Sequence, residues 1–376
     1  MRFRFDPEHD DLRDSVRNLM ADVSSEEALR RAMETERGWD AATWQRLAGD
    51  MELAGLAVPE RFGGAGYGLI ELGVVLREAG RNLLTAPLLS TSLAIRAVLA
   101  SGDETAAATH LPGLATGRST GTLAWLGPDA DRDSRPTVHA TRAGDGWTLT
   151  GPRDWVLDGH TADLLVVPAT TDAGISLFLV ERTAPGVHAE PVETVDPTRK
   201  TAHVELHGAS ATLLGEDGGG TAALQRALDE AAALLAAEQV GLAERCLEMA
   251  TEYAKQRKQF GKPIGSFQAI KHKLATVLLE LEAATSAMMY ALFVADRSPA
   301  ELADVACIAG MTCSEAALLA AAENIQVHGG IGATWEHPAH LYLKRATVDR
   351  QLLGAPQRYL DRLSDRIGLT PEPAAT

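Results

Sequence analysis

The chain has 376 residues, 45% of them hydrophobic and 23% charged, and a formal net charge of −16. This composition is that of a globular protein with room for two or three domains, and the acidic balance argues against nucleic-acid binding. The sequence shows no membrane-length apolar run and no signal-peptide core, and its three cysteines are too scattered for a zinc site or disulfide framework. We therefore expect a cytoplasmic protein with no metal site and no membrane span.

The first third of the chain has the periodicity of helices. In "DLRDSVRNLMADV" and "ATWQRLAGDMELAGLA" apolar residues recur three and four positions apart, and "TSLAIRAVLASG" ends at Gly102, a suitable helix C-cap. The glycine-rich "VPERFGGAGYG" separates two of these helical stretches. This pattern predicts an N-terminal helical domain over residues 1–115.

The middle of the chain has the pattern of strands. Five short runs rich in β-branched or aromatic residues are bounded by Gly, Asp and Pro: "TGTLAWLG", "DGWTLTG", "ADLLVVPAT", "ISLFLVER" and "TAHVELHG". Their close spacing predicts a middle antiparallel β domain over residues 116–216.

Helical periodicity returns in the last part of the chain. Long stretches begin near residues 222, 267 and 300, and a fourth covers residues 338–366. Several apolar faces of this length pack well as an antiparallel bundle. The sequence thus predicts an α+β protein that ends in a C-terminal four-helix bundle over residues 217–376.

A basic stretch interrupts this acidic chain between two of the long helices. "KQRKQFGKPIGSFQAIKHK", residues 255–273, holds six Lys or Arg and no acid. Arg257 can make two parallel hydrogen bonds to a phosphate, and Lys258 and Lys262 add positive potential. From charge alone, a solvated helix end with a Gly-Pro turn explains the stretch equally well.

Two further stretches have both a structural and a ligand-binding interpretation. In "NIQVHGGIGATWEHP", Gln326 falls in the last turn of a helix that ends at Gly329–Gly330, where exposed amides can contact phosphates. A plain C-cap explains this stretch as well, and His328 has the character of a structural residue. In "GPRDWVLDG", Trp155 is either a core anchor or the cover of a flat aromatic ligand.

Together and in this order, these stretches resemble the acyl-CoA dehydrogenase family. "RKQFGKPIGSFQAIKHKLA" and "QVHGGIGATWEHPAHLYLKRA" are similar to its two C-terminal signatures, "VPERFGGAGYG" to a turn of its N-terminal domain, and "GPRDWVLDG" to the strand behind the flavin. The resemblance spans residues 5–366. It implies FAD, an acyl-CoA thioester substrate, and a dimer or dimer of dimers in which each FAD lies across a subunit interface.

Half of the family's cofactor contacts match this chain. Arg257 and Phe260 match residues given to the neighbouring subunit's pyrophosphate and flavin, and Gln268 matches a position beside the ring system. Gln326, Gly329 and Gly330 match contacts to the ADP portion. The resemblance therefore implies that this chain donates a sound half-site to its neighbour, and Trp155 is a further cofactor-binding candidate.

The half-site that a subunit keeps for itself departs from the family pattern. The usual catalytic Glu position holds Leu353, and the alternative position on the preceding helix holds Ala231. Glu230 is adjacent to Ala231 and is the candidate base. Because one residue turns a helix by about 100°, its side chain need not face the site that position 231 would face. Leu126 and Leu157 replace the hydroxyl residues that bond to the flavin.

Three hypotheses follow from this contrast. The chain is a non-catalytic partner in a heterotetramer with a base-carrying member of the family, or a homodimeric or homotetrameric dehydrogenase with an unusual base such as Glu230. In the third hypothesis the fold serves a non-redox or flavin-free CoA-ester-binding protein. The resemblance also implies an electron-transfer flavoprotein as electron acceptor, while the acyl group is not readable from the sequence.

Overall fold

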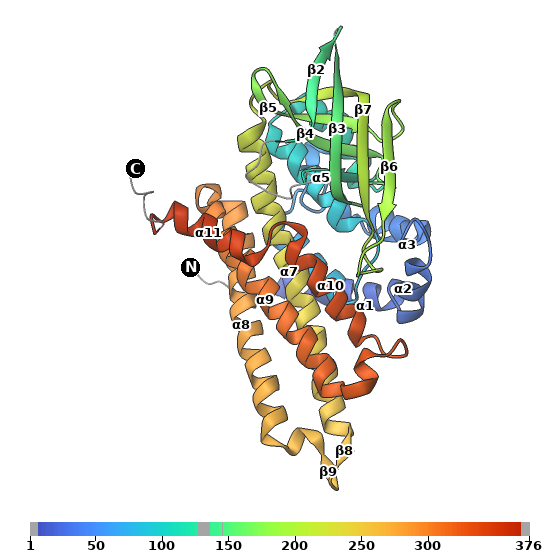
Figure 1. Ribbon diagram of the computed structural model, residues 1–376, viewed down its shortest axis with the longest axis vertical. Helices are drawn as coiled ribbons and strands as arrows, with labels where there is room; N and C mark the ends of the chain where they lie inside the picture. Colours follow the sequence, from blue (N-terminus) through green and yellow to red (C-terminus); the bar gives the residue numbers. More distant parts are fainter. Residues whose placement is uncertain (1–6, 127–135, 145, 370–376) are drawn as a thin grey trace. The chain divides into compact units, whose positions relative to one another are not determined.

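The computed structural model describes residues 7–126, 136–144 and 146–369, and the chain folds into two compact units (Figure 1). Unit 1 comprises residues 1–26, 73–84 and 232–376, and unit 2 comprises residues 27–72 and 85–231. Both units are discontinuous in the chain, and boundaries between them fall within helices α2, α4 and α7.

Unit 2 is built on a seven-stranded sheet that closes on itself. The strands follow the order β1-β4-β2-β3-β7-β5, β4 also pairs with β5, and β6 pairs with β7. The strands are β1 Gly121–Leu123, β2 His139–Ala143, β3 Gly146–Leu157, β4 Leu164–Thr171, β5 Gly174–Glu181, β6 Val187–Val192 and β7 Thr201–Leu214.

The middle β domain is confirmed, but it is not wholly antiparallel. Strand β4 runs parallel to β1 and to β2, whereas the other pairs of this sheet are antiparallel. Alternation of apolar and polar residues marks a strand, but it carries no information on the direction of the neighbouring strand. The mixed sheet is therefore a property that the sequence pattern could not supply.

Inward-facing side chains of the sheet form the core of unit 2, with Phe178 at 0% exposure and Trp147 packed edge-on to it at 5.4 Å.

The helices of this unit are α2 Glu26–Met33, α3 Ala41–Trp44, α5 Leu88–Ser101 and α6 Glu104–Ala115, with short helical turns at Gln45–Asp50, Leu53–Gly55 and Glu60–Phe62. Helix α5 is almost entirely buried, and Thr91 Oγ1 accepts a hydrogen bond from the β1 backbone. It ends at Gly102 in a left-handed conformation, as the sequence predicts.

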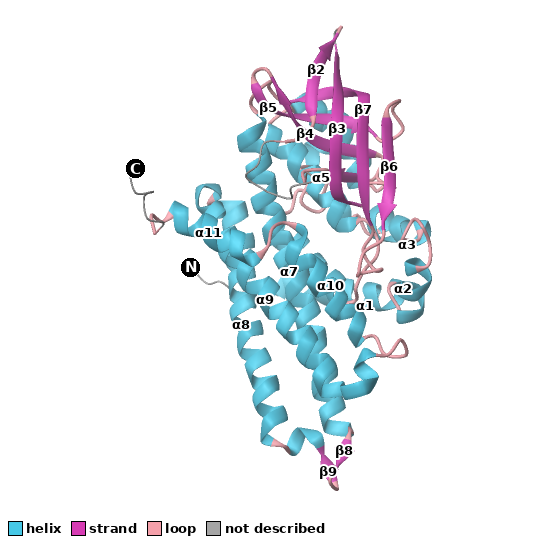
Figure 2. Cartoon of the chain, viewed as in Figure 1, coloured by secondary structure: helices cyan, strands magenta, loops and turns pink. Residues whose placement is uncertain are grey.

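Unit 1 is a helical bundle with one small hairpin (Figure 2). Its elements are α1 Pro7–Val23, α4 Leu69–Arg81, α7 Gly220–Gln256, β8 Lys258–Gln259, β9 Lys262–Pro263, α8 Gln268–Arg297, α9 Leu302–His328, α10 Ala339–Leu352 and α11 Pro356–Arg366, with short helical turns at Ile264–Ser266, Pro299–Glu301 and Gly329–Ala333. The fourth predicted helix is two helices. Gly354 has φ +119, and Pro356 cannot continue a helix, so the chain breaks between α10 and α11.

Close backbone contact joins α4 to α7 inside unit 1. A Cβ on Gly241 would lie 1.7 Å from the Arg77 carbonyl oxygen, and one on Gly80 would lie 1.9 Å from the Glu238 carbonyl oxygen. Arg77 forms an ion pair with Glu244 across the same contact. Only glycine at these two positions permits the helices to approach so closely.

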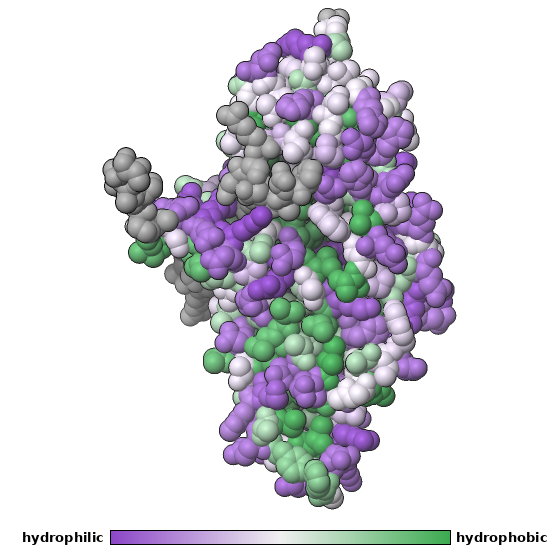
Figure 3. All heavy atoms as spheres, viewed as in Figure 1, coloured by the Kyte–Doolittle hydropathy of each residue, from purple (hydrophilic) through white to green (hydrophobic). Residues whose placement is uncertain are grey.

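Two helical stretches of unit 1, Gln268–Arg297 and Pro299–Ala333, are long and apolar enough to cross a membrane by length and composition alone. This corrects the expectation that no run reaches that length, because the helices tolerate a few charged residues within the window. Buried helices in a bundle core meet the same criterion, and 61% of the window in the second stretch is buried. The first stretch leaves Leu278 and Leu279 exposed, and hydrophobic residues gather on the visible surface of the bundle (Figure 3).

Candidate cofactor site

The basic stretch forms an exposed hairpin between α7 and α8. Strands β8 and β9 pair through Lys258–Pro263 and Gln259–Lys262. The two turn residues, Phe260 and Gly261, both have positive φ (52° and 77°), as a two-residue type I′ turn requires. The hairpin lies at the end of the bundle where α7 ends and α8 begins (Figure 1).

Phe260 stands at the tip of this hairpin with 89% of its surface exposed. Its ring contacts Phe267 edge-on at 6.1 Å. A left-handed conformation costs a non-glycine residue roughly 1 kcal/mol, and leaving a phenyl ring in water gives no burial in return. An exposed and strained aromatic tip is a feature that binding to another surface would explain.

Most of the basic residues in residues 255–273 have no carboxylate partner in the part of the chain that the structure describes. Lys255 pairs with Glu252 at 2.7 Å and Lys273 pairs with Glu323 at 2.6 Å. Within residues 7–126, 136–144 and 146–369, no carboxylate pairs with the other four basic residues, which are Arg257, Lys258, Lys262 and Lys271. A region this basic in a chain of net charge −16 is suited to an anionic ligand.

The second predicted stretch lies at the same end of the bundle. Helix α9 ends at His328, and Gly329 follows with φ +65. An added Cβ at Gly329 or Gly330 would meet nothing within 4 Å, so this backbone faces open space. Gln326 is exposed on the last turn of α9, and Gln268 is exposed at the start of α8.

A small apolar cluster joins the two stretches. Val327 of α9 packs with Ala250 and Ala254 of α7, and Ile264 and Ile270 of the basic stretch pack against this cluster. The structure thus brings together the six residues that the resemblance assigns to the donated half-site, in one region of unit 1. Trp155 and Glu230 belong to unit 2.

Three aromatic rings pack together at tilted angles behind the backbone of this region. His328 lies 4.3 Å from both Tyr253 and His337, ring centroid to ring centroid. Burial lowers the pKa of both imidazoles, and the neighbouring His328 lowers that of His337 further. His337 Nδ1 accepts a hydrogen bond from the Ala339 N–H at 3.2 Å, which caps α10. The sequence flagged His328 as structural but gave no signal for His337, because the contact is tertiary.

In unit 2, the residues that would face the flavin edge are apolar. Leu126 and Leu157 are both buried, and their backbone carbonyls accept hydrogen bonds: Thr122 Oγ1 donates to Leu157 at 2.6 Å and Asp154 N–H donates to Leu126 at 3.2 Å. Trp155 is 46% exposed and has a left-handed backbone conformation. These two positions offer no side-chain donor for a flavin ring, and each unsatisfied buried polar group costs about 1–3 kcal/mol.

Both carboxylate oxygens of Glu230 are occupied. Its side chain is fully buried; Oε2 accepts from Arg96 Nε at 2.6 Å and Oε1 from Arg226 Nε at 3.0 Å. Because both oxygens accept from guanidinium groups, neither is free to contact the α-carbon of a substrate unless an ion pair is broken. This geometry weighs against Glu230 as the base, and the neighbouring Ala231 has no titratable group.

Leu353, at the other position for the base, is held in place as a structural residue of unit 1. It is 1% exposed and caps the end of α10. The Tyr359 hydroxyl donates a hydrogen bond to its carbonyl at 3.1 Å, and the Tyr359 ring packs so closely on α9 that a Cβ on Gly310 would lie 2.7 Å from it. An aliphatic side chain has no atom that accepts a proton.

The residues fit FAD on one side only. The exposed backbone at Gly329–Gly330 and the Arg257 guanidinium, which has no carboxylate partner among the described residues, suit the phosphates of a dinucleotide. The apolar positions 126 and 157 do not suit the polar edge of its ring.

Family models match almost the whole chain. They describe the acyl-CoA dehydrogenase N-terminal domain over residues 6–118, the middle domain over residues 129–210 and the C-terminal domain over residues 218–368.

Two curated relatives match along nearly their full length. Acyl-CoA dehydrogenase IpdE2 of Mycobacterium tuberculosis is 39% identical over 96% of this chain and 97% of its own length. Acyl-CoA dehydrogenase FadE27 of the same organism is 32% identical over 96% of this chain and 97% of its own.

Solved structures give the same result. The ChsE4-ChsE5 complex from Mycobacterium tuberculosis matches with a TM-score of 0.90 and 30% identity, over 99% of this chain and 100% of the matched chain. A variant of the Tcur3481-Tcur3483 steroid ACAD matches with a TM-score of 0.89 and 33% identity, over 96% and 98% of the two chains.

Proposed function

Because the chain belongs to the acyl-CoA dehydrogenase family, we propose that it is the subunit that completes the FAD site of a base-carrying partner in a heteromeric enzyme. The family consists of flavoprotein oxidoreductases that act on CH–CH bonds. The partner would be a second family member that carries the catalytic Glu, and the reaction is α,β-dehydrogenation of an acyl-CoA thioester.

One observation carries this proposal: the hairpin of β8 and β9 has an exposed aromatic tip and, among the described residues, cations without carboxylate partners. Within the described part of its own subunit, neither burial of the Phe260 ring nor pairing with carboxylates stabilises this hairpin. Against a neighbour, Arg257 would bind the pyrophosphate, Phe260 would be buried beside the flavin, and Gln268 would lie near the ring system. Gln326, Gly329 and Gly330 would contact the ADP portion.

The half-site that this chain keeps for itself also supports a non-catalytic role. FAD, when bound, supplies the acceptor for the hydride that leaves the β-carbon. Removal of the α-proton needs a carboxylate with a free oxygen, and the three positions nearest this role hold Leu353, Ala231 and the doubly paired Glu230. The side chains of Leu126 and Leu157 cannot donate hydrogen bonds to a flavin, so the half-site that this chain keeps for itself is proposed to hold no functional flavin.

The named relatives support a heteromer. ChsE4-ChsE5 is a complex of two components, and Tcur3481-Tcur3483 is a steroid ACAD named for two. On this basis we propose a steroid-derived acyl-CoA thioester as the substrate class and an electron-transfer flavoprotein as the electron acceptor. A cytoplasmic location stays a proposal; it is supported by three buried free thiols, which suit a reducing compartment.

Purification of the chain alone and together with a base-carrying family member tests this proposal. We expect little flavin absorbance and no turnover from the chain alone, and turnover with fewer flavins than chains from the complex. In that complex, Arg257→Ala removes charge-assisted hydrogen bonds worth about 1.5–3 kcal/mol, so FAD should be held roughly 10- to 100-fold more weakly.

Lys255→Ala serves as the matched control, because Lys255 lies in the same basic stretch but is already paired with Glu252. It should leave FAD affinity unchanged. A full complement of FAD with turnover from the chain alone would support a homomeric dehydrogenase instead, and binding of CoA esters without FAD in every combination would support a flavin-free binding protein.

A further inference from the structure

Strand β3 has an irregularity at the tryptophan of "GPRDWVLDG". Arg153 pairs with Val204 and Val156 pairs with Ala202, so two residues of β3, Asp154 and Trp155, lie opposite the single residue His203 of β7. This is the arrangement of a β-bulge. Trp155 has φ +53, a left-handed conformation that costs a bulky residue roughly 1–2 kcal/mol. Such a conformation persists only where the surroundings hold it in place.

His203 and Asp154 supply contacts that hold the bulge. The Asp154 carboxylate lies 2.6 Å from His203 Nδ1, and the Asp154 N–H donates to the Leu126 carbonyl at 3.2 Å. On its other side, His203 Nε2 lies 3.3 Å from Glu205 Oε2. An imidazolium can donate to both carboxylates at once, whereas a neutral imidazole can donate to only one. Asp154 is thus tied to His203 by its side chain and to Leu126 by its backbone.

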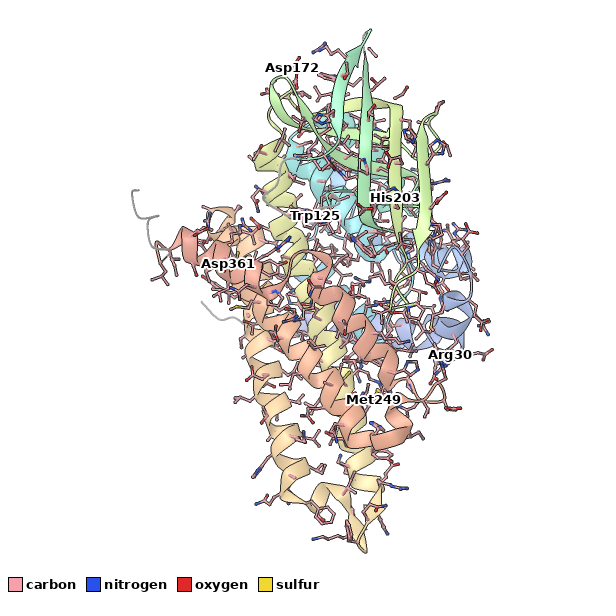
Figure 4. The ribbon with its side chains drawn as sticks, viewed as in Figure 1. Arg30, Trp125, Asp172, His203, Met249 and Asp361 are labelled. Atoms are coloured by element: carbon pink, nitrogen blue, oxygen red, sulfur yellow. The ribbon has the colours of Figure 1, made fainter. Side chains whose placement is uncertain are left out.

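Carboxylates face His203 from three strands. Asp154 faces it from β3 and Glu205 from its own strand, while Glu190 of β6 is its direct cross-strand partner. The hydrogen bond with Asp154 is the main reason that the pKa of His203 is raised, with further contributions from both carboxylates. Figure 4 labels His203 on the sheet of unit 2, where β7 runs between β3 and β6.

We propose that His203 is a positioning residue: in its protonated form it clamps Asp154, and the clamped bulge sets the position of Trp155 and of the Leu126 backbone. A neutral imidazole keeps only one of the two donated hydrogen bonds and carries no charge, so its hold on Asp154 weakens and Trp155 can move. The effect of this clamp on a bound flavin rests on the proposed function, since Trp155 is a candidate for covering the ring. The link between His203 and Trp155 does not.

The ¹⁹F NMR spectrum of the full chain labelled with 5-fluorotryptophan tests the clamp without any cofactor. Trp155→Phe assigns the Trp155 resonance. In the unsubstituted chain we expect this resonance to shift with pH, with a midpoint above the pKa of an ordinary histidine. In His203→Gln the titration should be lost. In Asp154→Asn, which keeps an oxygen acceptor but removes the charge, it should persist with its midpoint moved to lower pH.

His207→Gln is the matched control, because His207 is an imidazole on the same face of β7, two residues from Glu205. It should leave the Trp155 titration unchanged. A Trp155 resonance that does not titrate, or one that still titrates in His203→Gln, overturns the clamp. Neither outcome bears on the proposed function, which is decided by flavin content in the complex.

Discussion

Replacement of Glu230 by glutamine separates a structural role of this carboxylate from a catalytic one. In the structure, Glu230 is fully buried and joins helix α7 to Arg96 of α5 while also bonding to Arg226 one turn earlier in α7. Glutamine keeps the size of the side chain and removes its charge. The two arginines then lose their shared counterion, so the change acts on the folding of unit 2.

The size of the effect follows from the exposure of each partner. Arg226 is half exposed, and ion pairs of that kind contribute about 0–1 kcal/mol. Arg96 is 14% exposed and also donates to the Ala57 carbonyl. Removal of one member of a buried pair costs about 3–5 kcal/mol, and the retained amide oxygen recovers part of that. We expect Glu230→Gln to lower the free energy of unfolding by about 3 kcal/mol.

Urea unfolding followed by circular dichroism measures this loss as a lower midpoint of the transition that reports unit 2. Turnover per folded molecule, measured in the complex with a base-carrying partner, should stay within about 3-fold of the original, since about 0.7 kcal/mol changes a rate by that factor. Arg226→Gln is the control: it removes the more exposed pair and should lower the midpoint only slightly.

The opposite result would refute the structural assignment. If Glu230→Gln leaves the unfolding midpoint unchanged and abolishes turnover in the chain alone or in the complex, Glu230 acts as the base and its pairing with the arginines does not persist during the reaction.

Three further predictions follow from the packing. Gly241→Ala places a Cβ 1.7 Å from the Arg77 carbonyl oxygen, and because this contact is with backbone, the variant should unfold at a markedly lower urea concentration. Gly102→Ala is the control: with open space around it, its free energy of unfolding should fall only by the roughly 1 kcal/mol that a left-handed conformation costs. All three cysteine thiols are buried, and burial raises the pKa of Cys246 and Cys313, so a thiol reagent should label none of them in the native protein and all of them in denaturant. The pKa of His337 is lowered in the folded protein, so its contribution to stability is present above the pKa of the unfolded chain and is lost as pH falls through the folded value. His337→Asn keeps an acceptor for the Ala339 N–H and should weaken this acid sensitivity of the unfolding free energy. An unchanged dependence of stability on pH would contradict the assignment.

Much of the candidate site was predictable because its residues are close in sequence. The type I′ hairpin depends on a glycine and on two flanking short strands, and the end of α9 depends on Gly329. Both are local effects. The contrast between the basic stretch and an acidic chain was equally visible, since it needs only a count of charges.

Other features depend on contacts between distant segments. Three features each join residues 40 or more positions apart: the parallel pairing of β4 with β1, the Arg96–Glu230 ion pair and the His203–Asp154 pair. A helical wheel placed Glu230 one step from Ala231, but only the fold revealed that Arg96 occupies the direction in which Glu230 points.

The sequence by itself determined the order of helical and β segments, because this order depends on periodicity and turn chemistry. The donated half-site and the departures at Leu126, Leu157 and Leu353 are predictions that rest on the resemblance to the family, residue by residue. Only the tertiary structure decided which charges remain uncompensated. Lys255 and Lys273 have carboxylate partners and Arg257 has none within the described chain. Charge pairing depends on distances of a few ångströms between side chains, and folding alone sets those distances.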